Sequence, residues 1–300
     1  MPSVSSVEEA AELLRQATEA RRSVKIGDDL RLDGLDRVLE HEAGDLTCTV
    51  EAGIRLSRLN ARLAAAGQRL SLDPPGDPTI GGCVAEALSG PRRHRFGTPR
   101  DLVLGVTLVL GDGTVASAGG TVVKNVAGYD LGKLVCGSRG RLALIARVSL
   151  RLHPVPVSAR TVVVATRNAA AVVAALRRSQ LVPSALDVLH PGRVAVLFEG
   201  GEAAVAAQVA AALVLVGGAE SDDEVWHESR ERQGASRGVI RFRPGELASH
   251  LRGLDPGSVV RAGSGVAFIP TPTLPERRFP PLDALHDRLR AAFDPAGILS

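Results

Sequence analysis

The chain has 300 residues and a mass of 31.3 kDa, which fits one large domain or two domains of ordinary size. Its hydrophobic fraction of 45% and charged fraction of 23% are typical of a soluble globular protein and exclude a disordered or collagen-like chain. The net charge of +3 is a near balance of 36 basic and 33 acidic residues, so it does not indicate a nucleic-acid surface.

The three cysteines, Cys48, Cys83 and Cys136, contain no C-x-x-C pair. This spacing argues against a disulfide framework and against a cysteine-based zinc site, so we expect a reducing, cytoplasmic environment. The first residues lack the apolar core of a signal peptide. The most apolar stretch, residues 203–219, falls short of the about 20 apolar residues of a membrane span, and we expect no direct membrane insertion.

The first half of the chain predicts short helices and strands. Ser6 and Glu9 have the spacing of a capping box at the start of one predicted helix, and Ser57 is placed to cap a second helix that ends at Gly67. Residues 46–50 alternate between polar and apolar, as a half-buried strand does. Further predicted elements are a short strand at 25–26, a short helix at 84–88, and strands at 102–110, 115–117 and 142–152.

Two prolines, Pro154 and Pro156, mark our predicted domain boundary. The pattern after them is strand, helix, strand, strand, helix, at residues 161–165, 169–179, 185–189, 194–199 and 203–216. This order suits a small α+β layer of the split-βαβ kind. Two further strands, at residues 238–243 and 259–269, would complete its sheet. A last helix is predicted at 282–293. We therefore predict one domain over residues 1–155 and a second over residues 156–300.

Two stretches of the first half, residues 70–98 and 119–140, are rich in glycine. Glycines let backbone N–H groups come close to a ligand, and such groups suit phosphates and other anions. Neither stretch has the G-x-G-x-x-G dinucleotide pattern or a phosphate-binding P-loop. The glycine spacing alone fits an irregular connection rich in turns equally well.

Several blocks in a fixed order are more specific. They are VEAG at 50–53, PTIGG at 78–82, LSGPRR at 88–93, FGTPRDLVLG at 96–105, GDGT at 111–114, VVKNVAGYDLGKLVCGSRG at 122–140 and DPAGILS at 294–300. With these blocks the sequence resembles the VAO/PCMH-type FAD-binding family, and within it the FAD-binding accessory subunits of bacterial glycolate oxidases. The strong part of the resemblance covers residues 46–156, about a third of the chain.

The resemblance implies an α+β protein: a PCMH-type FAD-binding domain of two α/β subdomains, about 1–53 and 54–155, followed by a small ferredoxin-like α+β cap domain. The cofactor would be FAD, held noncovalently because no R-S-G-G-H attachment motif is present, in the cleft between the subdomains. The cofactor-binding positions that it implies are Pro75, Gly76, Thr79, Ile80, Gly81, Gly82, Gly90, Pro91, Arg92, Gly97, Asp101, Gly137, Gly140, Leu144 and Ile145. For Arg92, a solvated turn or an interface fits the sequence equally well.

The sequence departs from the family pattern at three places. The pyrophosphate loop R-G-x-G-T/S is replaced by Gly27-Asp28-Asp29, where two carboxylates stand in place of amide donors. Ala143 replaces a glycine, which is a mild change if its backbone angle is ordinary, and Arg139 replaces an acidic residue. The seven histidines are scattered without metal-ligand spacing, so we assign no metal site and no catalytic residue.

The leading hypothesis is an FAD-binding subunit of a glycolate-oxidase-like complex that oxidises a 2-hydroxy acid. In it the chain would serve as an accessory flavin or electron-transfer subunit beside a catalytic FAD subunit and an iron–sulfur subunit. One alternative is a noncatalytic assembly subunit that has lost FAD, which the altered Gly27-Asp28-Asp29 loop favours. The other is a self-sufficient FAD-linked oxidase of a small hydroxy acid or alcohol.

Overall fold

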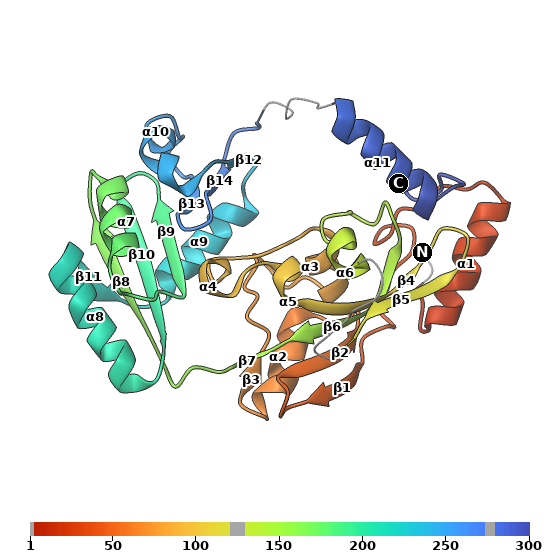
Figure 1. Ribbon diagram of the computed structural model, residues 1–300, viewed down its shortest axis with the longest axis horizontal. Coiled ribbons are helices and arrows are strands. Elements are labelled where there is room, and N and C mark those ends of the chain that lie inside the picture. The colour runs from red at the N-terminus through yellow and green to blue at the C-terminus, as the bar shows by residue number, and fades with distance from the viewer. Residues whose placement is uncertain (1–2, 121–129, 274–279) are drawn as a thin grey trace.

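The computed structural model describes residues 3–120, 130–273 and 280–300, and Figure 1 shows two sheets side by side along the long axis. Residues 121–129, which include most of the KNVAGYD part of the longest predicted motif, lie outside the described residues. A five-stranded sheet belongs to the first half of the chain and a seven-stranded sheet to the second. Each sheet has its own apolar core.

The five-stranded sheet has the order β1-β2-β6-β4-β5, with neighbouring strands antiparallel. Short helices and loops pack on it, and β3 pairs with β7 beside it. The elements of this half are α1 (Val7–Glu19), β1 (Val38–Glu42), β2 (Thr47–Glu51), α2 (Leu56–Ala64), β3 (Gln68–Arg69), α3 (Ile80–Ala85), α4 (Arg93–Phe96), α5 (Pro99–Leu102), β4 (Val103–Val109), β5 (Val115–Gly119), α6 (Leu131–Val135), β6 (Leu144–Arg151) and β7 (His153–Pro154).

Local sequence signals explain the first two helices. The Ser6 side chain accepts the N–H of Glu9 at 3.0 Å, and α1 buries its apolar stripe as predicted. Helix α2 begins one residue before the predicted cap, with Arg55 as its N-cap residue and no side-chain cap from it. The carboxylate of Asp77 supplies the missing acceptor, because it takes the N–H and the hydroxyl of Ser57 at 2.9 and 2.7 Å.

The position of α3 corrects a prediction. The sequence predicted a helix at 84–88 after the glycine pair, whereas the helix spans Ile80–Ala85 and contains Gly81 and Gly82. The reason is Thr79, whose hydroxyl accepts the N–H of Gly82 at 3.1 Å and starts the helix earlier. This capped turn places Gly81 against Ala52, the residue that follows β2.

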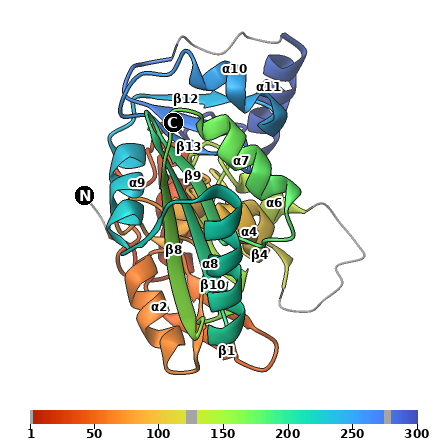
Figure 2. The same ribbon diagram turned by 90° about the vertical axis from the view of Figure 1, so that its left-hand side faces the viewer.

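The second half begins as a βαββαβ unit, with its sheet in the order β11-β8-β10-β9. That is the ferredoxin-like arrangement, and β13, β14 and β12 extend it beyond β9. Helices α7 and α8 cover one face and α9 the other (Figure 2). The elements are β8 (Ser158–Ala165), α7 (Ala169–Arg178), β9 (Ala185–Leu189), β10 (Arg193–Gly200), α8 (Glu202–Val216), β11 (Ala219–Ser221), α9 (Glu224–Gly234), β12 (Gly238–Arg241), a 3-10 turn (Pro244–Glu246), α10 (Leu247–Leu251), β13 (Val259–Arg261), β14 (Val266–Ile269) and α11 (Pro280–Phe293).

The C-terminal end returns to the first half of the molecule. After α11, Ile298 and Leu299 are buried in the core that α1 forms, and Val24 forms a parallel bridge with Leu299. The Asp294 carboxylate fixes this turn by accepting the N–H groups of Ile298 and Leu299 at 3.1 and 2.7 Å. These residues, which we had predicted as the end of a domain over 156–300, therefore complete the core of the first half.

Helix α8 carries the most apolar stretch of the sequence. Val205, Val209 and Ala212 face the sheet, while Val214 on the outer side is 89% exposed. Across residues 3–120, 130–273 and 280–300, no helix combines the length and the apolar character that crossing a membrane requires.

Candidate functional site

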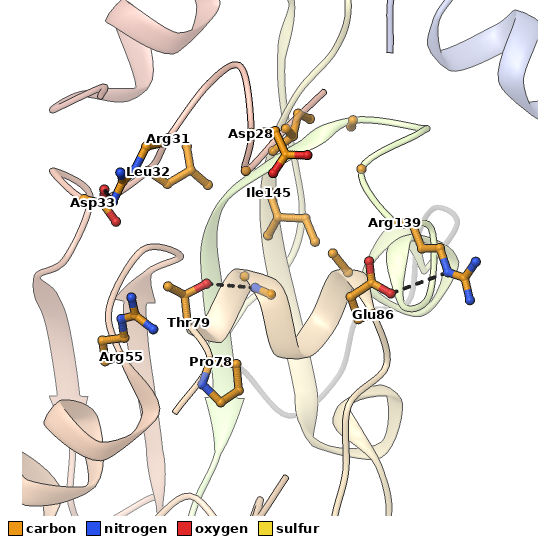
Figure 3. Close-up of a pocket in the computed structure, with 17 residues that line it drawn as sticks. Asp28, Arg31, Leu32, Asp33, Arg55, Pro78, Thr79, Glu86, Arg139 and Ile145 are labelled. Carbon is orange, nitrogen blue, oxygen red and sulfur yellow. Dashed lines mark hydrogen bonds and ion pairs between the residues drawn. The ribbon is translucent and has the colours of Figure 1, made fainter. Parts of the chain in front are cut away.

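A cavity of about 540 Å³ opens in the first half of the molecule, within the roughly 300–1,000 Å³ of small-molecule sites (Figure 3). The loop after α1, the start of α3 and the turn before β6 meet around it. Its lining residues are Ile26, Gly27, Asp28, Arg31, Leu32, Asp33, Arg55, Pro78, Thr79, Gly81, Gly82, Ala85, Glu86, Arg139, Gly140, Ala143 and Ile145. All of them belong to residues 26–145, so the seven-stranded sheet contributes none.

The glycine pair of α3 forms one wall of this cleft. A Cβ on Gly81 would lie 2.9 Å from the Cβ and 3.0 Å from the carbonyl oxygen of Ala52, so only glycine lets the helix pack this closely. A Cβ on Gly82 would find only the Thr79 hydroxyl within 4 Å, at 3.1 Å, so the missing side chain leaves room on this wall of the cleft.

The N–H groups of this turn are already used inside the protein. Ile80 donates to the carbonyl of Ile54 at 2.9 Å, and Gly81 donates to the carbonyl of Ala52 at 2.7 Å. Gly82 donates to the Thr79 hydroxyl. Our interpretation of these glycines as a source of free amides was therefore wrong, because their physical role is close packing.

The loop at residues 25–30 is closed in the same way. The N–H of Gly27 donates to the carbonyl of Leu30 at 2.9 Å. The N–H groups of Asp28 and Asp29 both donate to the carbonyl of Lys25, at 3.2 and 2.8 Å. The Asp29 carboxylate accepts the N–H of Lys25 at 2.8 Å, so the loop is a compact hydrogen-bonded turn. Its amides do not form the anion cradle that the family pattern has at this place.

Most charges of the cleft are paired at its edge. Asp28 binds the ammonium of Lys25 at 2.5 Å, and this hydrogen bond with its charge attraction raises the pKa of Lys25. Arg31 pairs with Asp33 at 2.6 Å, and Arg139 pairs with Glu86 at 3.4 Å.

Arg55 is the exception among these charges. Its Nη1 donates to the backbone carbonyl of Asp77 at 2.7 Å, and among the described residues no carboxylate lies within ion-pair distance of it. Figure 3 shows Arg55 beside Thr79, on the side of the cleft away from Arg139.

The turn before β6 completes the cleft. Gly140 has φ +76°, and a Cβ there would lie 3.3 Å from the Cβ of Ile26, so glycine brings this turn against the opposite wall. Within the described part of the chain, Arg139 (φ +55°) is one of four non-glycine residues with positive φ, and Ala143 is not among them. The replacement of glycine by Ala143 therefore costs no backbone strain, which resolves the alternative that we left open.

The structure brings together five of the fifteen predicted cofactor-binding positions and places others elsewhere. Thr79, Gly81, Gly82, Gly140 and Ile145 line the cleft. Ile80 and Leu144 are buried in the core, Gly76 lies in an exposed turn, and Gly97 and Asp101 lie at α5. Gly137 lines a separate groove with α11, and Pro75 lies beside Gly234 of α9, where the two halves meet.

Gly97 and Asp101 shape the loop that leads into α5. The Asp101 carboxylate accepts both the N–H and the hydroxyl of Thr98 at 2.8 Å. Gly97 has φ +81°, and a Cβ there would lie 2.6 Å from that carboxylate. This capping box holds the loop, and the role toward FAD that we predicted for the two residues stays a prediction.

Gly90, Pro91 and Arg92 lie where the two halves meet. A Cβ on Gly90 would lie 1.7 Å from the carbonyl oxygen of Asp73, so this glycine is also required by packing. Arg92 pairs with Glu199 of β10 at 3.0 Å and with Asp73 at 3.4 Å. The structure thus supports the interface alternative for Arg92.

Sequence reasoning missed Arg31, Asp33, Arg55 and Glu86. Arg55 stands two residues after the VEAG block, but nothing in the sequence shows that it pairs with Thr79, with which it forms an antiparallel bridge. The other three are exposed or half-exposed charges whose position at the cleft depends on long-range packing. Over the described residues, no group of three or more histidine, cysteine or acidic side chains is arranged to hold a metal ion.

Comparison with known proteins identifies this region. Residues 28–119, which include the lining residues from Asp28 to Glu86, match the family model described as an FAD binding domain. The chain is 34% identical over 201 residues to "Glycolate oxidase subunit GlcE" of Escherichia coli (strain K12), covering 65% of this chain and 56% of that protein. It is 33% identical over 172 residues to "D-lactate dehydrogenase [cytochrome] 1, mitochondrial" of Saccharomyces cerevisiae (strain ATCC 204508 / S288c), covering 55% of this chain and 29% of that protein. The chain therefore spans about half or less of the length of these relatives.

A solved structure of alkyldihydroxyacetonephosphate synthase has the same fold, with a TM-score of 0.72, 15% sequence identity, and coverage of 99% of this chain and 74% of that one. The cleft also fits the cofactor in part: its volume, its glycine wall and the guanidinium of Arg55 suit a flavin dinucleotide, whereas the amide cradle for its phosphates is lacking. The predicted resemblance is thus confirmed for residues 28–119, which match an FAD binding domain, and this match supports FAD as the cofactor.

Proposed function

We propose that this chain is the accessory FAD-binding subunit of a complex that oxidises glycolate or another 2-hydroxy acid. Its bound FAD would supply a redox centre that accepts and passes on electrons. The role of this chain would be to hold FAD in the cleft of its first half, apart from the site where the substrate C–H bond breaks. The similarity to a glycolate oxidase subunit over 65% of the chain supports this role.

The observation that carries the accessory role is the composition of the cleft. The ionisable side chains that line it are three acids, each held by a basic neighbour, and three arginines. None of the seven histidines of the sequence is among the described residues that line it. A general base for removing a substrate proton needs a free position beside the substrate, and carboxylates held in ion pairs do not offer one.

The second half of the molecule supports the same conclusion. None of its residues lines the cleft, and ion pairs hold it against the first half at Arg69, Arg92 and Glu199. We therefore propose that substrate chemistry belongs to a separate catalytic FAD subunit and that an iron–sulfur subunit takes up the electrons. The word "subunit" in the names of similar proteins, GlcE and GlcD, supports such an assembly.

The test is a spectrum of the purified chain, followed by identification of the flavin released on denaturation. We expect the absorption of a noncovalent flavin that is released as FAD, is reduced reversibly by dithionite and is not reduced by glycolate under anaerobic conditions. Adding the purified catalytic subunit should then allow glycolate to reduce both flavins.

Two other outcomes would replace this proposal. A chain that contains no flavin and takes up none from added FAD would be an assembly subunit, which the closed loop at Gly27-Asp28-Asp29 favours. A chain whose flavin is reduced by glycolate without any partner would be an oxidase in its own right.

A further inference from the structure

We propose that Arg55 is the residue that holds the pyrophosphate of FAD in this chain, in place of the amide-rich loop that the family pattern has. This inference rests on the proposed function only in that the cleft binds FAD. None of the sequence motifs described above includes Arg55. The proposal follows from two observations: the amides that could bind a phosphate are already hydrogen-bonded, and the other charges of the cleft are already paired.

Backbone amides at the two turns where a phosphate could bind already have partners inside the protein. In the loop at residues 25–30, the N–H groups of Gly27, Asp28 and Asp29 bond to backbone carbonyls. At the start of α3, the N–H groups of Ile80, Gly81 and Gly82 bond to two carbonyls and to the hydroxyl of Thr79. A phosphate at either turn would have to break an internal hydrogen bond for each amide that it recruited.

Most of the charged side chains around the cleft are paired with one another. A carboxylate close to a phosphate is repulsive, and Asp28 lies in the lining of the cleft. Lys25 offsets this carboxylate at 2.5 Å, and Asp33 and Glu86 offset Arg31 and Arg139. These three pairs add no net attraction for an anion, so the guanidinium of Arg55 supplies the positive charge of the cleft.

Arg55 is fixed by its backbone and by one hydrogen bond of its side chain. Its backbone forms an antiparallel bridge with Thr79, and one side-chain nitrogen donates to the carbonyl of Asp77 at 2.7 Å. This bond uses one of the five N–H donors of a guanidinium and leaves the others for a ligand in the cleft that the side chain lines. A guanidinium keeps its charge at any physiological pH, and two of its N–H groups match two oxygens of a phosphate.

The experiment measures the dissociation constants of FAD, ADP and riboflavin for the apo chain by fluorescence and calorimetric titration. Riboflavin has no phosphate, so it separates pyrophosphate binding from binding of the ring. We expect Arg55→Gln to weaken FAD and ADP about tenfold and to leave riboflavin unchanged, because one charge-assisted contact is lost. Arg55→Lys should restore part of the affinity, and the weakening of FAD binding by salt should be smaller in Arg55→Gln than in the natural chain.

Two matched variants control for folding and net charge. Arg62→Gln, at the other end of α2 and outside the cleft, should bind all three ligands as the natural chain does. Asp28→Asn should tighten FAD binding severalfold, because it removes a carboxylate from the cleft and frees Lys25. Asp45→Asn, which removes a carboxylate from an exposed turn away from the cleft, should leave the affinity for FAD unchanged. A gain of affinity in Asp28→Asn cannot result from misfolding.

The outcomes separate this inference from the proposed function. If the natural chain binds FAD and Arg55→Gln binds it within twofold, the assignment of Arg55 is overturned while the flavin role stands. Equal losses for riboflavin and FAD would also overturn it, since Arg55 would then act on the shape of the cleft. A natural chain that binds none of the three ligands overturns both.

Discussion

The Nε of Arg92 donates to Oε1 of Glu199 at 3.0 Å, and this hydrogen bond joins the two halves of the molecule. Arg69 donates to both carboxylate oxygens of the same glutamate at 2.9 Å, so a single buried carboxylate of β10 holds two arginines of the first half. Burial of Glu199 opposes its ionisation, but the hydrogen bonds and charges of Arg69 and Arg92 outweigh it and lower its pKa to about 2.

The change Glu199→Gln tests the strength of this junction. We expect it to lower the free energy of unfolding by about 3 kcal/mol, because it removes the carboxylate that pairs with the partly buried guanidinium of Arg69 and one of the two that pair with Arg92. Urea denaturation measures the loss. Glu42→Gln, at an exposed position of β1, is the matched control and should change the midpoint little; equal effects of the two changes would mean that the junction contributes nothing specific.

Acid sensitivity should follow from the same carboxylate. Because the pKa of Glu199 in the folded state lies below its usual 4.5, its contribution to stability is fully present above pH 4.5 and is lost as the pH falls toward about 2. Unfolding free energies between pH 6 and 3 should therefore fall more steeply for the natural chain than for Glu199→Gln. Parallel curves for the two proteins would contradict this.

Asp73, which also contacts Arg92, should act with the opposite sign. Burial raises its pKa from 3.8 to about 6, although the charge of Arg92 opposes the shift. The folded state then binds the proton more tightly, so the contribution of Asp73 to stability falls as the pH rises from about 4 to 6. We expect Asp73→Asn to flatten the pH dependence over this window, and thermal unfolding between pH 4 and 8 measures it.

A second buried ion pair lies inside the seven-stranded sheet. Arg261 of β13 contacts Asp187 of β9, and both side chains are almost fully buried beside Ser229. Arg261→Met should cost about 3–5 kcal/mol, because it leaves the Asp187 charge unpaired in the core. The double variant Asp187→Leu with Arg261→Met should recover much of the lost free energy of unfolding, as measured by urea denaturation. A double variant that is less stable than Arg261→Met alone would contradict this and would show that the ion pair itself stabilises the sheet.

The thiols should be unreactive in the folded protein. Burial raises the pKa of Cys48 and of Cys83 to about 12, and that of Cys136 to about 11. At pH 8 a thiol reagent such as DTNB should therefore modify none of them until the chain is unfolded in urea. Rapid modification of one thiol in native buffer would show that its part of the first half opens readily.

Patterns within single elements predicted most of the fold. The Ser6 cap of α1, the strand β2 and the β-α-β-β-α order at the start of the second half appear where the sequence placed them, because each depends on neighbours in the chain. The strand β11, which follows α8 and completes the ferredoxin-like unit, was not predicted. The start of α3 was missed because a glycine pair usually breaks a helix, whereas here contact with Ala52 selects glycine.

The cleft was harder to predict than the fold. The motifs located Thr79, Gly81 and Gly82 on its wall, but the role of their amides depends on the carbonyls of Ala52 and Ile54, which fold back from the preceding turn. Arg92 resembled a phosphate-binding residue in the sequence, and only the partner Glu199, 107 positions away, shows that it belongs to the interface. Long-range partners of this kind leave no local pattern.

We expect FAD to bind in the cleft between the loop at residues 25–33 and α3. To test this, FAD is titrated into the apo forms of the natural chain, of Ala85→Phe, whose ring would fill the cleft, and of Ala64→Phe on the exposed side of α2. We predict saturable binding of FAD by the natural chain and by Ala64→Phe, and loss of binding in Ala85→Phe. Undiminished binding by a folded Ala85→Phe variant would contradict this expectation, because the cofactor would then lie elsewhere.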